Sequence, residues 1–71
     1  MSTLRPGTYR HYKDKLYEVI GVARHSETEE LHVVYRPLYG DRALWIRPLA
    51  MFDETIEVEG RAVKRFTFVH D

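Results

Sequence analysis

Turn-forming residues recur along this chain at intervals too short for ordinary helices. They stand at Pro6-Gly7, Asp14, Gly21, the polar stretch 25–30, Gly40-Asp41, Pro48 and Gly60. The segments between them are rich in Tyr, Val, Ile, Phe and Trp, and no window keeps the apolar spacing of a helix. Strands are therefore predicted near residues 7–13, 16–25, 31–39, 43–47, 54–59 and 62–69.

One short stretch, residues 48–52, predicts a helical turn. Proline suits the first helical position, and Leu49 and Phe52 are spaced to share a buried side. Asp53 and Glu54 then follow, where negative charge opposes the helix dipole. A single 3₁₀ turn is expected.

Five to six short antiparallel strands and one turn in 71 residues predict a single mainly β domain over residues 1–71, with its core at about 5–69. A small SH3-like barrel fits this pattern, because a closed sheet leaves no exposed edges. The competing arrangement is an open antiparallel sheet that dimerisation completes.

Two glycines mark irregular positions. A bulge at Gly21 would align Tyr17 and Val19 with Val22 on one face, as the corner of a small barrel requires. Near the carboxyl end, residues 55–68 predict a hairpin in which Gly60 supplies the positive φ of the turn.

The segment YRPLYGDRALWIRPL, residues 35–49, predicts another hairpin, with residues 40–42 as its loop. In this register Pro37 faces Trp45 and Tyr35 faces Arg47. A two-residue loop would instead set Arg36 opposite Arg47, a like-charge pair that costs stability.

The register sorts the side chains into two faces. One face holds the aromatic residues with one arginine, and residues 31 and 33 fall on the same side. The other face is aliphatic and is expected to be the core side. Two interpretations of the aromatic face stay open: a ligand-binding surface, or large core residues of a small domain. The first face consists of Tyr35, Pro37, Tyr39, Trp45 and Arg47; the second is mainly Val34, Leu38, Leu44 and Ile46.

The residues needed for a disulfide, a metal site or a catalytic triad are missing or wrongly spaced. There is no cysteine, so disulfides and Cys-based zinc sites are absent. The four histidines lack helical metal spacing, although His11 and His25 could meet across strands. Residues 25–27 contain triad residue types, but consecutive side chains cannot converge as triad partners do. Glu57 and Glu59 are expected on the solvent side of a strand. We expect no enzyme activity, no metal and no cofactor.

The balance of charged residues and the pattern at the start of the chain indicate what the protein can bind and where it is located. The chain has eleven basic and eleven acidic side chains, which disfavours a strong binder of duplex DNA. Arginine outnumbers lysine eight to three, and its planar fork suits specific contacts. The start of the chain has no signal-peptide pattern, and no apolar run could span a membrane, so a cytoplasmic location is expected.

Four motifs occur in a specific order: Y-R-H-Y-K, A-R-H-S-E-T, Y-x-x-L-Y-G and W-x-R-P-x-x-M-F. Over about residues 5–66 the chain resembles the small bacterial domain-of-unknown-function family 1653. The resemblance implies an SH3-like barrel. It implies no established activity, cofactor or catalytic residue.

The hypothesis that follows is a non-enzymatic module that binds a peptide or another protein, as a monomer or weak homodimer. Single-stranded nucleic acid bound on the same face is the alternative. The loop at Arg24 and His25 is expected to flank the site, because loops on small barrels often carry binding residues. The predicted ligand contacts are Tyr35, Tyr39, Trp45, Arg47, Arg24 and His25.

Overall fold

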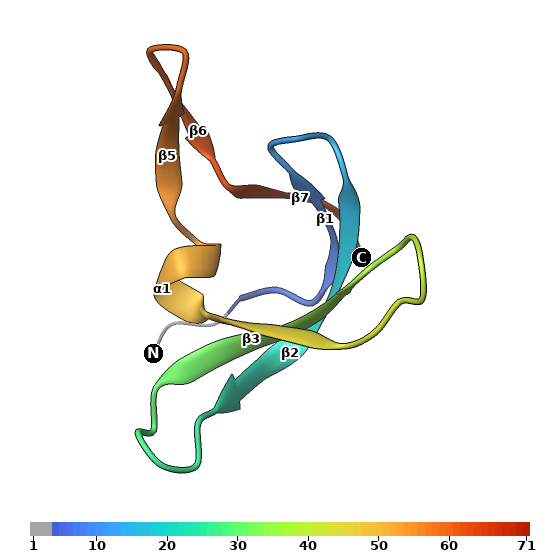
Figure 1. Ribbon diagram of the computed structural model, residues 1–71, viewed down its shortest axis with the longest axis vertical. Coiled ribbons are helices and arrows are strands. Elements are labelled where there is room, and N and C mark those ends of the chain that lie inside the picture. Colours follow the sequence, from blue (N-terminus) through green and yellow to red (C-terminus); the bar gives the residue numbers. More distant parts are fainter. Residues whose placement is uncertain (1–3) are drawn as a thin grey trace.

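The computed structural model describes residues 4–71, and this part of the chain is mainly antiparallel β with one helical turn, as predicted (Figure 1). The amino-terminal end of the predicted domain, residues 1–3, lies outside the described residues. No helix within residues 4–71 is long and apolar enough to cross a membrane. The elements are β1 (Gly7–His11), β2 (Leu16–Arg24), β3 (Leu31–Pro37), β4 (Trp45–Pro48), α1 (Leu49–Phe52), β5 (Thr55–Val58), β6 (Arg61–Lys64) and β7 (Phe66–His70).

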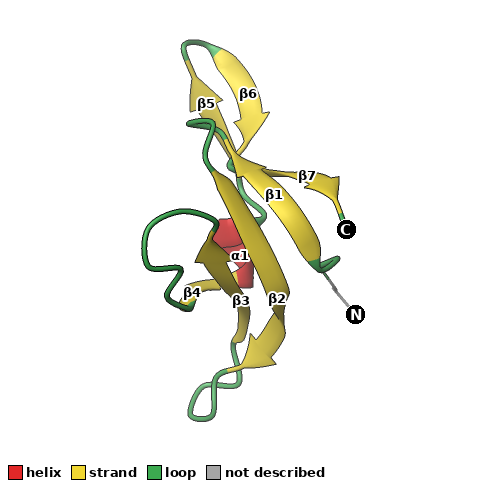
Figure 2. Ribbon diagram, turned by 90° about the vertical axis from the view of Figure 1, so that its right-hand side faces the viewer, coloured by secondary structure: helices red, strands yellow, loops and turns green. Residues whose placement is uncertain are grey.

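Five strands form one sheet in the order β4-β3-β2-β1-β7, and β5 pairs with β6 as a separate hairpin. Figure 2 shows this hairpin at one end of the molecule and the β2–β3 loop at the other. In the described chain β4 and β7 are the outer strands of the sheet and are not hydrogen-bonded to each other, so the predicted closure into a barrel is not found. After β4 the chain leaves the sheet through α1 and the hairpin, and it returns only beside β1.

The predicted last strand, 62–69, is divided into two strands at Arg65. The Arg65 backbone N–H donates to the carbonyl oxygen of Glu54 at 2.9 Å, and its own carbonyl accepts from Tyr12 at 3.0 Å. These two bonds hold Arg65 at the corner where the chain passes from the hairpin to the main sheet. The predicted turn at Gly60 is confirmed, with positive φ at both Glu59 and Gly60.

The predicted bulge in β2 is confirmed. Val19 pairs with Tyr35 and Gly21 pairs with Val34, so Ile20 is the extra residue. After this shift Val22 lies opposite a core residue of β3 rather than on the outer face.

The β3–β4 hairpin has a different register from the predicted one. Tyr35, not Pro37, lies opposite Trp45, which is a shift of two residues. Because side chains alternate with a period of two, this shift leaves each residue on its predicted face. The loop is longer than three residues because the β3–β4 pairing ends at Tyr35 and Trp45. Beyond that point β3 stays paired with β2, and the Leu38 N–H donates to the carbonyl of Leu16 at 3.0 Å.

The prediction that the aliphatic face is the core side is wrong. Leu44 and Ile46 are each 63% exposed, whereas Val33 and Tyr35 on the aromatic side are 0% and 2% exposed. The reason is tertiary: α1 and β7 both pack on the aromatic side and bring further rings to it.

Two of these rings form the centre of the core. Phe52 of α1 and Phe66 of β7 stack in parallel, with centroids 4.0 Å apart and planes 2° from each other. Tyr9 and Tyr35 meet Phe52 edge-on at 5.6 and 5.3 Å. Burying one such ring stabilises the fold by about 1.5–3 kcal/mol. The other buried core residues are Tyr17, Val19 and Val33.

α1 is a single turn at the predicted place. Its backbone bond from Asp53 N–H to the Leu49 carbonyl, at 2.9 Å, spans four residues, so the turn is α rather than 3₁₀. Phe52 is buried and Leu49 packs against the core, which confirms their predicted shared side.

Gly7→Ala is expected to lower the free energy of unfolding by about 1–3 kcal/mol. Gly7 has φ of 142°, and an added Cβ would lie 2.8 Å from the carbonyl oxygen of His70. Gly21→Ala is the matched control, because a Cβ there has no heavy atom within 4 Å. Urea unfolding followed by fluorescence of the single tryptophan measures both variants. Equal midpoints for the two would contradict this prediction.

Candidate binding face

Two large aromatic side chains are half exposed on the same side of the sheet. Trp45 is 43% and Tyr39 is 44% exposed. Both rest on buried tyrosines: the Trp45 ring is 6.0 Å from that of Tyr35 and 6.1 Å from that of Tyr17, and the Tyr39 ring is 5.8 Å from Tyr17. We call the surface formed by Tyr39, Trp45 and the neighbouring Arg47 the aromatic–arginine face.

Tyrosine hydroxyls hold this face in place. The hydroxyls of Tyr17 and Tyr39 are 2.8 Å apart and share a hydrogen bond. Arg47 Nε donates to the Tyr35 hydroxyl at 3.2 Å. Lys15 Nζ lies 5.4 Å from the centre of the Tyr39 ring. Burial, together with the hydrogen bond to Tyr39, raises the pKa of Tyr17 to about 12, so this hydroxyl stays neutral at physiological pH.

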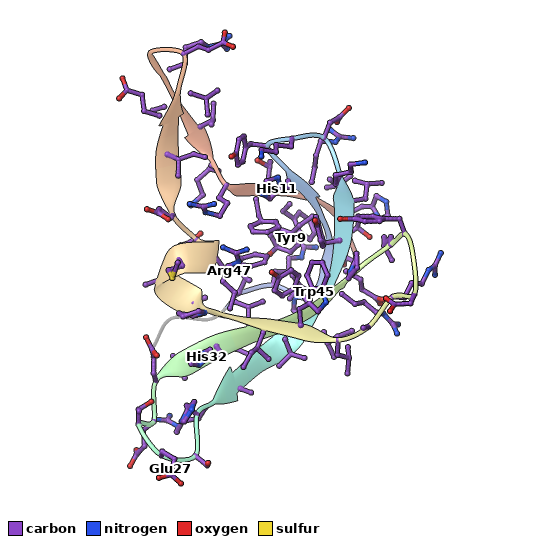
Figure 3. All side chains as sticks on the ribbon, in the orientation of Figure 1. Tyr9, His11, Glu27, His32, Trp45 and Arg47 are labelled. Atoms are coloured by element: carbon purple, nitrogen blue, oxygen red, sulfur yellow. The ribbon has the colours of Figure 1, made fainter. Side chains whose placement is uncertain are left out.

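Positive charge gathers beside the rings. The guanidinium carbon of Arg47 lies 5.9 Å from the centre of the Phe66 ring, and the His11 ring meets Phe66 edge-on at 5.0 Å. Burial and then the positive charges of Arg65, Arg47 and Lys13 lower the pKa of His11 from its ordinary value of 6.5. His11 is therefore neutral at neutral pH. Figure 3 shows Arg47 among the side chains between α1 and β1, with Trp45 beside it.

The structure brings four of the six predicted contacts together: Tyr35, Tyr39, Trp45 and Arg47. Tyr35 is buried, so it reaches the face only through its hydroxyl. Trp45 fits both interpretations of the aromatic face: its ring packs on buried core tyrosines, and part of it is exposed to solvent.

The predicted loop residues Arg24 and His25 bond within their own loop rather than to the aromatic rings. Arg24 is two residues along β2 from Val22, whose partner Val33 pairs with Arg47, so Arg24 lies towards the Arg47 end of the face. His25 Nδ1 accepts the backbone N–H of Glu27 at 3.0 Å, and Arg24 pairs with Glu29 at 3.7 Å. Both side chains therefore stabilise their own loop, which projects at the far end of the molecule (Figure 3).

Three residues beside the face were not among the predicted ligand contacts: Tyr17, His11 and Arg65. Strand alternation does place Tyr17 and His11 on the inner side, and that signal could have identified them. Arg65 had no such signal, because its position follows from the corner between two sheets. His11 and His25, which could have met across strands, do not meet, because His11 ends β1 beside the start of β2 and His25 follows the end of β2. The His25 ring is instead 5.7 Å from that of His32.

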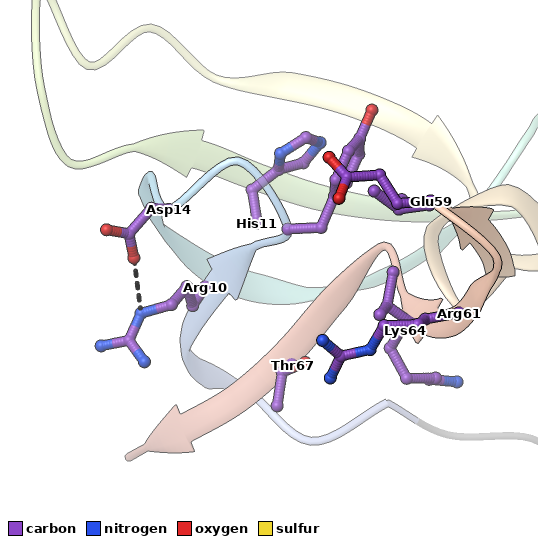
Figure 4. Close-up of a pocket in the computed structure, with 10 residues that line it drawn as sticks. Arg10, His11, Asp14, Glu59, Arg61, Lys64 and Thr67 are labelled. Carbon is purple, nitrogen blue, oxygen red and sulfur yellow. Dashed lines mark ion pairs between the residues drawn. The ribbon is translucent and has the colours of Figure 1, made fainter.

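A hollow of about 360 Å³ lies elsewhere, between the β1–β2 turn and the β5–β6 hairpin (Figure 4). Three of its charged side chains are paired within the protein: Arg10 with Asp14 at 3.4 Å, and Lys64 with Asp53 at 2.8 Å. Residues 4–71 contain no group of three or more side chains placed to hold a metal ion. The aromatic–arginine face is thus the best-defined candidate site in the described chain.

Comparison with known proteins places the chain among relatives of the same fold. The family model for the protein of unknown function DUF1653 matches residues 7–68. A crystal structure of a DUF1653 protein from Bordetella bronchiseptica is 40% identical, with a TM-score of 0.85 over 93% of this chain and 87% of that one. A search of curated proteins found no match. The resemblance read from the sequence motifs is confirmed, and the chain belongs to the DUF1653 family.

Proposed function

We propose that this domain is a non-enzymatic module that binds a peptide segment of another protein through the aromatic–arginine face. The observation that carries the proposal is the half exposure of Trp45 and Tyr39 beside Arg47. Tryptophan, tyrosine and arginine are the residues that most often dominate binding energy at protein interfaces.

The rigidity of this face supports the proposal. The Trp45 ring rests on two buried tyrosines, and the Tyr39 hydroxyl is bonded to that of Tyr17. Side chains that are ordered before binding lose little conformational entropy on binding. The Tyr17 hydroxyl, with its raised pKa, is suited to donate and accept hydrogen bonds rather than to act as a general base.

The edge position of β4 supports an extended peptide as the ligand. Among the described strands, β4 pairs only with β3, so its other edge lacks a strand partner. A peptide that adds as a strand beside β4 would pass Trp45 and Arg47, which alternate on the same face. Main-chain bonds would give affinity and these two side chains would give selectivity.

Single-stranded nucleic acid is the alternative ligand. One observation favours it: Lys15 lies over the Tyr39 ring, so cations alternate with exposed aromatic rings on which bases could stack. The formal net charge of zero weighs against it, because phosphate binding depends on an excess of basic side chains.

We further propose that the module acts in the cytoplasm as a monomer or weak homodimer. The absence of cysteine suits a reducing compartment. The outer edges of the sheet would allow a second copy to add weakly.

Trp45→Ala is expected to weaken binding of peptides selected from a displayed random library by about tenfold or more, because a central aromatic contact is removed. Leu44→Ala is the matched control: Leu44 is next in sequence and more exposed, but lies outside the face. Isothermal titration measures both variants, after circular dichroism has confirmed that each is folded. Equal affinity of the two would contradict the proposed site.

The nucleic-acid alternative predicts affinity for a short single-stranded oligonucleotide that falls steeply as salt is raised. Fluorescence anisotropy of a labelled oligonucleotide measures this. An absence of binding at low salt would exclude the alternative and leave the peptide proposal in place.

The lowered pKa of His11 predicts a loss of stability in acid. The unfolded chain protonates at about pH 6.5, whereas folded His11 protonates only at lower pH. The unfolded chain therefore binds the His11 proton first, and the free energy of unfolding falls as the pH drops from about 6.5 towards the folded pKa of His11. In His11→Asn, which keeps an acceptor for the Lys13 N–H, stability should fall less between about pH 7.5 and about pH 5.5. Urea unfolding measures this; an unchanged pH dependence would disprove it.

A further inference from the structure

Three arginines of the described chain are half buried: Arg36, Arg47 and Arg65. Two of them have a carboxylate partner. Arg36 Nε lies 2.9 Å from Glu18 Oε1, and the terminal nitrogen of Arg65 lies 3.1 Å from Glu54 Oε1. Arg47 differs, because no carboxylate within residues 4–71 lies within 4 Å of it, and its Nε donates to the Tyr35 hydroxyl.

Charged groups taken partly out of water are normally paired with an opposite charge. The Tyr35 hydroxyl orients Arg47 but does not neutralise it. The two terminal nitrogens of Arg47 make no hydrogen bond within the described residues. Arg65 Nε is the one side-chain nitrogen or oxygen there that is fully covered and has no hydrogen-bond partner, so the terminal nitrogens of Arg47 are not fully covered. The terminal nitrogens of Arg47 are therefore reachable from solvent, in the fork geometry that receives a carboxylate with two parallel bonds.

We infer that the peptide bound by the aromatic–arginine face carries a carboxylate, which the terminal nitrogens of Arg47 receive while an adjacent apolar group packs on Trp45. This inference rests on the proposed function and specifies its ligand. The carboxylate belongs either to an Asp or Glu side chain or to the carboxyl terminus of the peptide.

The surroundings of Arg47 favour a single carboxylate over a polyanion. Arg65 is close enough to act on the charge of His11, as Arg47 does, but Glu54 already balances it. His11 is neutral at neutral pH. Lys15, over the Tyr39 ring, is a second cation without an ion pair among residues 4–71, but Arg47 is the cation beside Trp45. The Trp45 end of the face thus offers one unbalanced positive charge in an apolar, aromatic setting, which matches one negative charge beside a flat or apolar group.

Benzoate is the minimal probe, with benzamide as its uncharged counterpart of the same shape. In NMR titrations followed at the single tryptophan indole and the Arg47 Nε–H, benzoate is expected to bind about tenfold more tightly than benzamide. Arg47→Gln should remove this preference, and Arg47→Lys should keep part of it. Arg61→Gln, which changes an exposed arginine on the β5–β6 hairpin, should leave it intact. Equal binding of benzoate and benzamide to the unchanged protein would overturn the inference.

Peptides selected from the random library separate this inference from the proposed function. Enrichment of Asp or Glu, or a loss of affinity when the peptide carboxyl terminus is amidated, would support the inference and identify the source of the carboxylate. Selected peptides that lose affinity with Trp45→Ala, but bind Arg47→Gln as tightly as the unchanged protein, would overturn the inference and leave the proposed function standing.

Discussion

The parallel stack of Phe52 and Phe66 is the contact on which the rest of the structure depends. It joins α1 to β7 across the inner side of a sheet that hydrogen bonds do not close. Tyr9 of β1 and Tyr35 of β3 meet Phe52 edge-on, so the strands on either side of β2 are held to the same centre. In a chain of 71 residues, which buries a limited share of its surface, a few large rings must supply most of the apolar contact.

The same layer of rings builds the candidate site. Tyr35 is part of the core, and its hydroxyl orients Arg47 at the surface. Tyr17 likewise supports Trp45 with its ring and Tyr39 with its hydroxyl. Core and site therefore share residues, and for this reason the two interpretations of the aromatic face do not exclude each other. A half-exposed ring buries less apolar area and so stabilises the fold less, but it presents a fixed apolar surface to a ligand.

Part of this face could be predicted from the sequence, and part could not. Alternation along residues 35–39 and 45–47 correctly placed Tyr39, Trp45 and Arg47 on one side, and a register error of two residues did not disturb it. The loop at Arg24 and His25 was expected to flank the site because loops on small barrels often carry binding residues. Local hydrogen bonds explain that loop without a ligand.

Local chemistry in the sequence determined the strands, the turn at Gly60, the bulge at Gly21 and the division of the hairpin residues between two faces. These features depend on backbone conformation and on side-chain alternation, which neighbouring residues decide. Only the tertiary structure decided which face became the core. That choice depended on where α1 and β7 packed, and their rings made the aromatic side the inner one, while Leu44 and Ile46 were left in solvent. It also decided that Arg47 has no carboxylate partner among residues 4–71, because pairing of charges depends on contacts between residues far apart in the chain.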